Sequence, residues 1–231
     1  MNSISWMLRI CLLFIVLVFL NMTSYSQEEK TTTEKFGLHS AGLSLGWFNP
    51  SMDYWKTKSE FKGADYSGAL EVNAIIDFQI VTNLHGQVGL GYWQESIKDS
   101  LQNFGNTTLM LTGIPISIDL RYQIEPLKFS LFTPYLGAGG EFLFVEHKMI
   151  FDLNDAPPAK TGSTVMGNLS AGIETKLSDQ FAIDLDFRYK FGNYKQDFKI
   201  ENPANPDESD VVTETISLNG PRIGITLRYI L

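Results

Sequence analysis

Eight stretches in which apolar and polar residues alternate recur along this chain, and they constrain its fold more than any other feature. They are residues 41–48, 70–80, 87–93, 109–124, 135–145, 167–177, 182–191 and 221–231. A period of two residues is typical of a β-strand with two different environments on its faces. No stretch sustains the i, i+3, i+4, i+7 spacing over the length of a helix, so the sequence predicts an all-β fold.

The connections between these stretches alternate between long and short. The long ones are residues 49–68, 94–108, 146–164 and 192–220, and the short ones are 81–85, 125–130 and 178–180. This order is typical of an up-and-down transmembrane barrel, with long loops outside and short periplasmic turns. Most stretches supply the roughly 9–11 residues that a tilted membrane-spanning strand needs. We therefore predict an eight-stranded antiparallel transmembrane β-barrel whose two ends of chain face the periplasm.

The first residues indicate export. Arg9 precedes an unbroken apolar run over residues 10–20, and Ser24 and Ser26 follow it at the spacing of a cleavage site. We expect a signal peptide over 1–26, a polar lead over 27–36 and a barrel over 37–231. An uncleaved anchor helix is the alternative, but the run falls short of the roughly 20 residues such a helix needs. A lipoprotein is disfavoured because Cys11 begins the apolar run rather than ending it.

Composition excludes further classes of protein. Cys11 is the only cysteine, so the mature chain would hold together without disulfides. Loss of Arg9 with the signal peptide would leave 17 Lys and Arg against 26 Asp and Glu. An acidic chain disfavours nucleic acid as a partner, since that needs a basic surface. The mean hydropathy of -0.04 shows no helical membrane character.

The polar face of the predicted strands carries glycines interleaved with single charged residues. The stretch Gln87, Gly89, Gly91, Trp93 is one example. Glycine weakens strands and marks crowding, so this face resembles the filled interior of a narrow barrel. The acids on it are Glu71, Asp77, Asp119, Glu141, Glu174, Asp184 and Asp186, and the bases are Arg121, Lys176, Arg188, Lys190, Arg222 and Arg228. We predict that they form a charge network that plugs the lumen, against the alternative of ordinary solvated residues.

The opposite face is the candidate lipid surface. It includes Leu43, Leu45 and Trp47 in the first stretch, and its aromatic residues concentrate at the ends of the stretches, where interfacial girdles lie. One stretch conflicts with this assignment of faces, because Phe129 and Leu131 are odd-numbered and Leu136 is even-numbered, so a regular strand would place them on opposite faces. A bulge near Pro134 would reconcile them.

The last stretch, "PRIGITLRYIL", can pair with residues 41–48, because a closed barrel has no free edge. Arg222, Gly224, Leu227 and Tyr229 in it resemble the terminal assembly signal of outer-membrane barrels. Together with "AGLSLGW", "GQVGLGYW", "GIPISIDLRYQI" and "PYLGAGGEFLF", they make residues 37–231 similar to the family of small outer-membrane β-barrel proteins that includes OmpA-like and PorT-like barrels. The resemblance implies the outer membrane of a Gram-negative bacterium, with its lipid and the barrel assembly machinery as partners. The family's members differ widely in role, so no role follows.

The search for chemistry predicts no enzyme, no metal and no cofactor. A lipid-modifying barrel would need a serine, a histidine and an acid together. His39 and Ser40 are adjacent, and neighbouring strand residues should point to opposite faces. The acidic stretch 201–210 lacks the spacing of a calcium loop. Tyr54 and Trp55 could form a contact surface in the first outer loop or the top of the aromatic girdle.

Two hypotheses about function remain open. The first is a non-enzymatic barrel that contacts an unknown protein or surface partner through its outer loops or its periplasmic side, as an adhesin, envelope-structural protein or secretion subunit. The second is transport of small or apolar solutes. A secreted, soluble binding barrel is disfavoured by the terminal pattern and the glycine-rich polar face.

Overall fold

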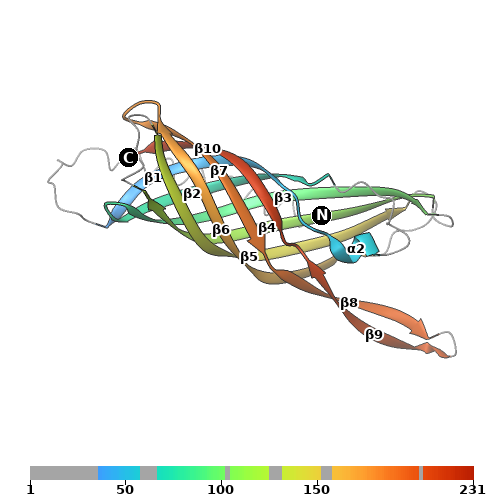
Figure 1. Cartoon of the computed structure of the whole chain (residues 1–231). Coiled ribbons are helices and arrows are strands. Elements are labelled where there is room, and N and C mark those ends of the chain that lie inside the picture. The colour runs from blue at the N-terminus through green and yellow to red at the C-terminus, as the bar shows by residue number, and fades with distance from the viewer. Residues whose placement is uncertain (1–35, 58–66, 102–104, 125–131, 152–157, 203–204) are drawn as a thin grey trace.

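Eight antiparallel strands close into a barrel in this computed structural model (Figure 1). It describes residues 36–57, 67–101, 105–124, 132–151, 158–202 and 205–231. The barrel strands are β1 (Gly37–Phe48), β2 (Ala69–Val81), β3 (Leu84–Leu101), β4 (Gly105–Gln123), β5 (Phe132–Phe151), β6 (Lys160–Lys176), β7 (Phe181–Phe191) and β10 (Gly220–Ile230). A separate hairpin comprises β8 (Asn193–Asn202) and β9 (Asn205–Ser217), and α2 (Asp53–Thr57) is a short helix. Of the described residues, none lies in a helix long and apolar enough to cross a membrane.

The last strand closes the barrel on the first. β10 pairs with β1 from Ser40↔Ile230 to Phe48↔Arg222, and with β7 on its other side. The predicted eight-stranded antiparallel barrel is therefore confirmed. We call the end where β1 starts and β10 ends the terminal end, and the opposite end, which carries α2 and the hairpin, the loop end (Figure 1).

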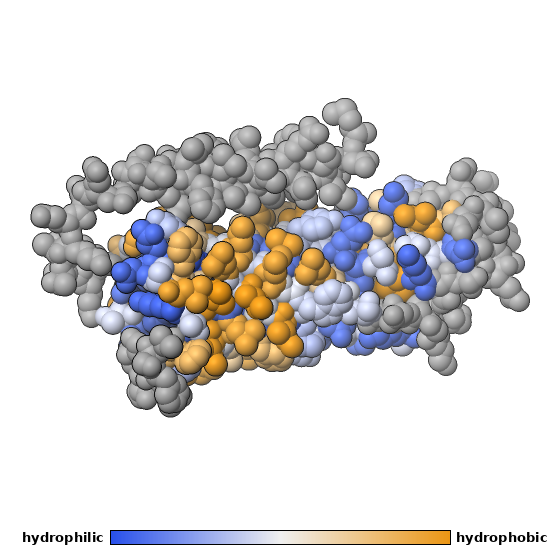
Figure 2. All heavy atoms as spheres, turned by 90° about the horizontal axis from the view of Figure 1, so that it is seen from above, coloured by the Kyte–Doolittle hydropathy of each residue, from blue (hydrophilic) through white to orange (hydrophobic). Residues whose placement is uncertain are grey.

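An apolar band surrounds the barrel next to the terminal end. Its outward side chains are largely exposed and include Leu45, Val72, Ile118, Leu185 and Ile225. Figure 2 shows these hydrophobic residues gathered across the barrel wall, with hydrophilic residues toward both ends. The predicted lipid face is thus the outer face of the barrel, as an interior too narrow for anything but side chains requires.

The polarity of the two faces inverts along the strands that continue past this band. Toward the loop end, the outward residues of β3 to β6 become polar, namely Gln94, Ser96, Lys98, Thr108, Glu146, Lys148, Thr161 and Ser163. Most inward residues there become apolar and buried, namely Trp93, Ile97, Leu109, Leu111, Leu143, Val145 and Met166, with Glu95, Thr107 and His147 buried among them. The register between β3 and β4 stays constant through this change. Each of these strands therefore spans lipid near the terminal end and continues toward the loop end as part of a water-exposed barrel extension.

Two expectations about the strands are corrected. No register shift occurs at Pro134, which pairs with Ile173 in continuous register, and Phe129 and Leu131 lie outside the described residues. The irregularities lie instead between Leu38 and Ser40 and between Gln79 and Val81. The long connection 192–220, expected as a loop, is mostly the β8–β9 hairpin, whose strands pair from Asn193↔Ser217 to Asn202↔Asn205.

Candidate functional site

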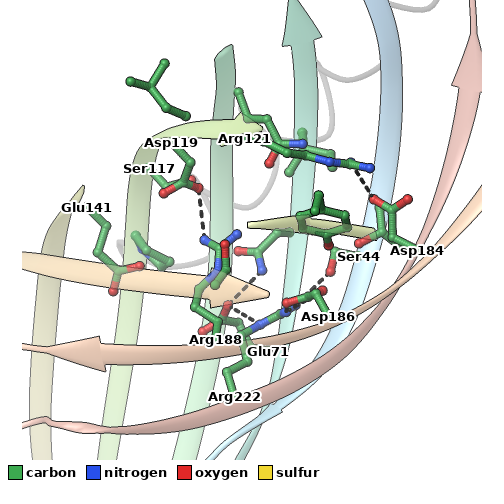
Figure 3. Close-up of a pocket in the computed structure, with 18 of the residues that line it drawn as sticks. Ser44, Glu71, Ser117, Asp119, Arg121, Glu141, Asp184, Asp186, Arg188 and Arg222 are labelled. Atoms are coloured by element: carbon green, nitrogen blue, oxygen red, sulfur yellow. Dashed lines mark hydrogen bonds and ion pairs between the residues drawn. The ribbon is translucent and has the colours of Figure 1, made fainter. Parts of the chain in front are cut away.

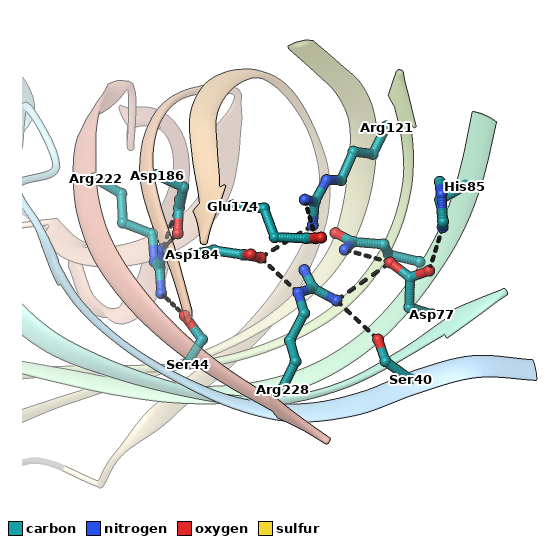
Figure 4. Close-up of polar contacts among 11 residues, drawn as sticks. Ser40, Ser44, Asp77, His85, Arg121, Glu174, Asp184, Asp186, Arg222 and Arg228 are labelled. Carbon is teal, nitrogen blue, oxygen red and sulfur yellow. Dashed lines mark hydrogen bonds and ion pairs between the residues drawn. The ribbon is translucent and has the colours of Figure 1, made fainter. Parts of the chain in front are cut away.

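The lumen next to the terminal end contains a connected group of buried ion pairs (Figure 4). Arg228 on β10 lies 2.5 Å from Asp184 on β7 and 3.2 Å from Asp77 on β2. Arg121 on β4 lies 3.0 Å from the same Asp184 oxygen and 2.5 Å from Glu174. Asp184 thus joins the two arginines, and strands from opposite sides of the barrel are tied together across its interior.

A second group lies one layer further toward the loop end. Arg222 contacts Glu71 at 2.8 Å and Asp186 at 3.0 Å, and it donates a hydrogen bond to the Ser44 hydroxyl. On the other side of the lumen, Asp119 accepts hydrogen bonds from Arg188 at 2.9 Å and from Asn168 at 2.8 Å.

Lys190 also belongs to the network and lies at its edge nearest the loop end. Its ammonium lies 2.6 Å from Glu71 and 3.0 Å from Glu141, and 4.8 Å from the centre of the Phe48 ring. The side chain is 1% exposed, so these contacts replace its water shell. Phe48 belongs to the buried apolar cluster toward the loop end. Lys190 therefore lies at the boundary between the charged and the apolar parts of the interior.

Glycines supply the space that these long side chains occupy. A Cβ atom on Gly46 would lie 2.5 Å from the guanidinium carbon of Arg222, and one on Gly224, opposite Gly46 in the register, would also collide with Arg222. A Cβ on Gly139 would collide with Asp119. The interleaved glycines and charges of the sequence are thus explained by crowding inside a narrow barrel.

Side chains of the network crowd the lumen from several strands (Figure 3). A cavity among Ser44, Ser117, Tyr135 and the charged side chains has a volume of about 30 Å³, room for one or two water molecules. Among the described residues, seven carboxylates face five Lys or Arg cations in this network, an excess of two negative charges. An ion entering the lumen would have to separate buried pairs, which is costly because each partner would remain in a desolvated site.

The structure gives twelve of the thirteen charged residues of the predicted network a buried or half-buried place on the inner face. Eleven of them are Glu71, Asp77, Asp119, Arg121, Glu141, Glu174, Asp184, Asp186, Arg188, Arg222 and Arg228, and each has a side-chain ion-pair contact. Lys190 joins them, whereas Lys176 is exposed beside the β6–β7 turn.

Apolar residues close the lumen a second time at the loop end. Met52 and Trp55, from α2 and the residue before it, pack with Trp93, Leu111 and Ile216 in a cluster whose members are almost fully buried. Ser51 donates a hydrogen bond to the Ser217 hydroxyl, which holds α2 against the base of the hairpin. We call this cluster and α2 the apolar cap.

The apolar cap corrects the expectation for the first outer loop. Trp55 is 3% exposed and packs edge-on against His147 at 4.8 Å, so it is neither a surface contact nor part of a lipid girdle. Tyr54 is half-buried against the same cluster. His147 lies on β5 between the polar outward residues Glu146 and Lys148, beyond the lipid-facing band. Burial, and the charge of nearby Lys160, lower the pKa of His147 to about 4.

The terminal end differs from expectation at His39. The register shift between Leu38 and Ser40 interrupts the alternation, and the His39 ring lies 4.7 Å from the ring of His85 inside the lumen. His39 and Ser40 therefore share the inner side instead of facing opposite ways. Ser40 accepts a hydrogen bond from Arg228, so a cation faces this hydroxyl where a nucleophile would need a general base.

The four residues of the predicted assembly signal divide between the two faces of β10. Arg222 and Gly224 point into the lumen, and Leu227 is half-exposed on the lipid side. Tyr229 packs edge-on against Phe181 of β7 at 5.5 Å. Recognition of these residues by the assembly machinery stays a prediction.

Sequence reasoning missed the apolar cap and the contacts of Asp77 with His85 and Gln87. His85 was assigned to a turn, but it lies on β3 and contacts Asp77 at 2.8 Å, while Gln87 donates to the other oxygen of Asp77. The alternation of β3 could have placed His85 inward had the strand been started three residues earlier. The side chains of the acidic stretch 201–210, considered above for calcium, lie outside the described part of the structure.

A closed eight-stranded barrel with an apolar outer band and a charged interior defines a transmembrane β-barrel of the outer-membrane type. The chain belongs to the family described as the outer membrane protein beta-barrel domain, whose model matches residues 12–219. No curated protein matches the chain in sequence.

Solved structures similar to this chain include several outer-membrane proteins. OprG from Pseudomonas aeruginosa is similar with a TM-score of 0.57 and 12% identity, covering 87% of this chain and 99% of OprG. The Neisserial surface protein A gives a TM-score of 0.47 and 12% identity over 84% and 96% of the two chains. The outer membrane protease OmpT from Escherichia coli gives 0.46 and 10% over 88% and 99%. At these identities the likeness shows the fold alone.

Proposed function

We propose that this protein is a non-enzymatic, non-conducting barrel of the outer membrane that acts by presenting its loop end to a partner. The observation that carries the proposal is the filled lumen, in which buried ion pairs connect β2, β4, β6, β7 and β10 through the centre of the barrel. Since steady flow of ions would break such pairs, the barrel serves as an anchor rather than as a channel.

The barrel extension supports a presenting role. A strand that only spans lipid needs about 9–11 residues, whereas β3, β4 and β5 contain 18, 19 and 20. The additional residues form a folded body with its own apolar interior, and the β8–β9 hairpin projects from it (Figure 1). A rigid support of this kind positions a contact surface at a fixed distance from the membrane.

Orientation and export belong to the same proposal. The chain would be exported through a signal peptide cleaved after Ser26, and the terminal end would face the periplasm. The short two-residue turn between β2 and β3 at the terminal end and the long projections at the loop end follow the usual arrangement of outer-membrane barrels. The partner at the loop end would be a protein or a cell surface.

Conductance of the purified mature protein in planar lipid bilayers tests the proposal. We expect no steady current steps above the bare membrane, and we expect proteolysis of whole cells to cut the β8–β9 hairpin while the barrel stays intact. As a comparison, Asp184→Asn with Arg228→Gln removes two opposite charges of the network, with an unchanged size at residue 184 and a shorter side chain at residue 228. Stable, ion-selective steps from the unaltered protein would instead make transport of small solutes the better reading.

A partner is sought by comparing the unaltered protein with a variant in which residues 195–215 are replaced by a short Gly-Ser turn. Cells carrying each form are crosslinked and the barrel is recovered in detergent. We expect one or more proteins to be recovered with the unaltered form and lost with the shortened one. Recovery of the same proteins with both forms would argue against the hairpin as the contact surface.

A further inference from the structure

Two of the three histidines in the chain meet one aspartate at the terminal end of the lumen. His39 on β1, Asp77 on β2 and His85 on β3 lie on three neighbouring strands, and one donor atom from each lies within 4.8 Å of the others. Asp77 and His85 are buried, whereas His39 is half-buried and leaves the group a route to solvent. His85 and Asp77 appear at the right of Figure 4, at the edge of the ion-pair network.

A local irregularity of β1 creates this group. Leu38 pairs with Phe78 and Ser40 pairs with Asp77, so His39 is an additional residue in β1 opposite a regular β2. Such bulges re-aim a side chain and are over-represented beside functional sites. Here the bulge directs the His39 ring onto the His85 ring. The backbone carbonyl of His39 accepts a hydrogen bond from the Leu231 amide. Without the additional residue, His39 would face outward beside the lipid.

The surrounding charges leave room for a cation. The ion pairs next to the group comprise three carboxylates, Asp77, Glu174 and Asp184, and two guanidinium groups, Arg121 and Arg228. One negative charge is therefore unbalanced there. Arg228 contacts only the Oδ2 atom of Asp77, and the Oδ1 atom faces His85.

We propose that His39, Asp77 and His85 form a binding site for a divalent transition-metal ion, with zinc as the representative case. Two imidazole nitrogens with one carboxylate oxygen are a donor set that suits zinc and its neighbours, whereas calcium and magnesium prefer oxygen donors alone. Three protein ligands leave an open position for water or for a group from another molecule. Ligands of one zinc ion lie about 2 Å from it, so modest rotations of the three side chains would bring the donor atoms close enough.

Such an ion would clamp β1, β2 and β3 at the terminal end, where β1 also meets the closing strand β10. The inference does not depend on the proposed presenting role at the loop end. It assigns the terminal end a separate property, which is responsiveness to a metal ion on that side of the membrane.

Titration of the mature protein in detergent with ZnCl₂ tests the proposal, using calorimetry and protein purified without a polyhistidine tag, since a tag would bind the metal itself. We expect one zinc per barrel, no binding of calcium or magnesium, and visible absorption when cobalt replaces zinc. His39→Ala should weaken zinc binding by at least about tenfold. It is the preferred variant because no ion pair of the network includes His39.

His147→Ala is the matched control, since it removes the third histidine from the apolar cap at the other end of the barrel. We expect its zinc affinity to equal that of the unaltered protein. Asp77→Asn provides a second lesion of the site, and heat-modifiable migration on gels verifies that each variant is folded. Absence of zinc binding to the unaltered protein, or equal affinity in folded His39→Ala, would overturn the proposal, as would a loss that follows His147→Ala instead.

Discussion

Arg228 on β10 and Asp184 on β7 form a buried ion pair that crosses the pairing of these strands diagonally, with 2.5 Å between the Nε and Oδ2 atoms. In the register, Arg228 lies opposite Ala182 and Asp184 lies opposite Thr226. Arg222 and Asp186 form a second diagonal pair that leans the opposite way along β10, since Asp186 lies opposite Gly224. Diagonal neighbours on one face of a sheet are within reach of long side chains. The closing strand is thus held to β7 from inside by two diagonal ion pairs that lean toward each other.

Arg228→Ala and Asp186→Ala should each destabilise the barrel strongly. Each takes one ion-pair contact from buried partner charges that keep only their remaining contacts, and removing one partner of a buried pair costs about 3–5 kcal/mol. Urea unfolding in lipid vesicles, followed by heat-modifiable migration, measures the loss. Lys176→Ala removes an exposed charge at the β6–β7 turn and should change the free energy of unfolding by less than about 0.5 kcal/mol. Equal unfolding midpoints for the three variants would refute a structural role for the network.

A substitution of one glycine should destabilise the apolar part of the interior. A Cβ atom on Gly113 would collide with the Trp93 ring, which is fully buried. Gly113→Ala should therefore lower the free energy of unfolding by about 1–3 kcal/mol through overpacking. Gly86→Ala is the control, because a Cβ there would meet its nearest atom, Ile80 Cδ1, at an ordinary 3.4 Å. If both variants unfold at the same urea concentration, the close packing around Trp93 is not rigid.

The sequence sufficed for the barrel because lipid and a crowded lumen impose opposite preferences on alternate residues. Ile116, Ile118 and Leu120 on one parity, and Asp119 and Arg121 on the other, assign each face of β4 without any tertiary information. Antiparallel order makes β7 and β10 neighbours and lets their acids and arginines meet, but the particular partners Asp186 and Arg222 depend on the register. The apolar cap could not be derived in this way, because the apolar parity changes within a strand. Leu109 and Leu111 point inward while Ile116 points outward, and only the depth of the membrane determines where the change occurs.

The bulge at His39 was equally hidden. A single additional residue changes which face every residue before it occupies, but it leaves no mark in the composition of β1. The β8–β9 hairpin was hidden for another reason, since the alternation in residues 193–217 is weak and mixed with turn-forming residues.

Acid should destabilise the barrel extension through His147. Its pKa of about 4 in the folded protein lies below the ordinary value of 6.5, so the unfolded chain binds a proton that the folded chain excludes. The stability present above pH 6.5 is therefore lost as the pH falls from 6.5 toward 4, by up to about 3 kcal/mol. His147→Gln cannot bind this proton. The difference in free energy of unfolding between the two proteins, measured at pH 7.5 and at pH 4.5, should change in favour of the glutamine variant. A difference independent of pH would show that the folded protein binds the His147 proton as readily as the unfolded chain does.

Tyr229→Asp should prevent assembly of the barrel. Tyr229 lies on the lipid side of the closing strand, two residues before the end of the printed sequence, and contacts Phe181 on β7. A carboxylate near the membrane interface costs only up to about 1 kcal/mol in itself, so a complete failure of insertion would require a second effect, namely loss of the terminal pattern that the assembly machinery binds.

Tyr122→Asp separates the two effects. Tyr122 is an exposed aromatic residue at the terminal end of β4, outside the terminal pattern. We expect cells to degrade Tyr229→Asp while Tyr122→Asp and Tyr229→Phe reach the outer membrane in heat-modifiable form. Normal abundance of folded Tyr229→Asp would show that the terminal residues are not an assembly signal, and equal failure of both aspartate variants would attribute the defect to the lipid face alone.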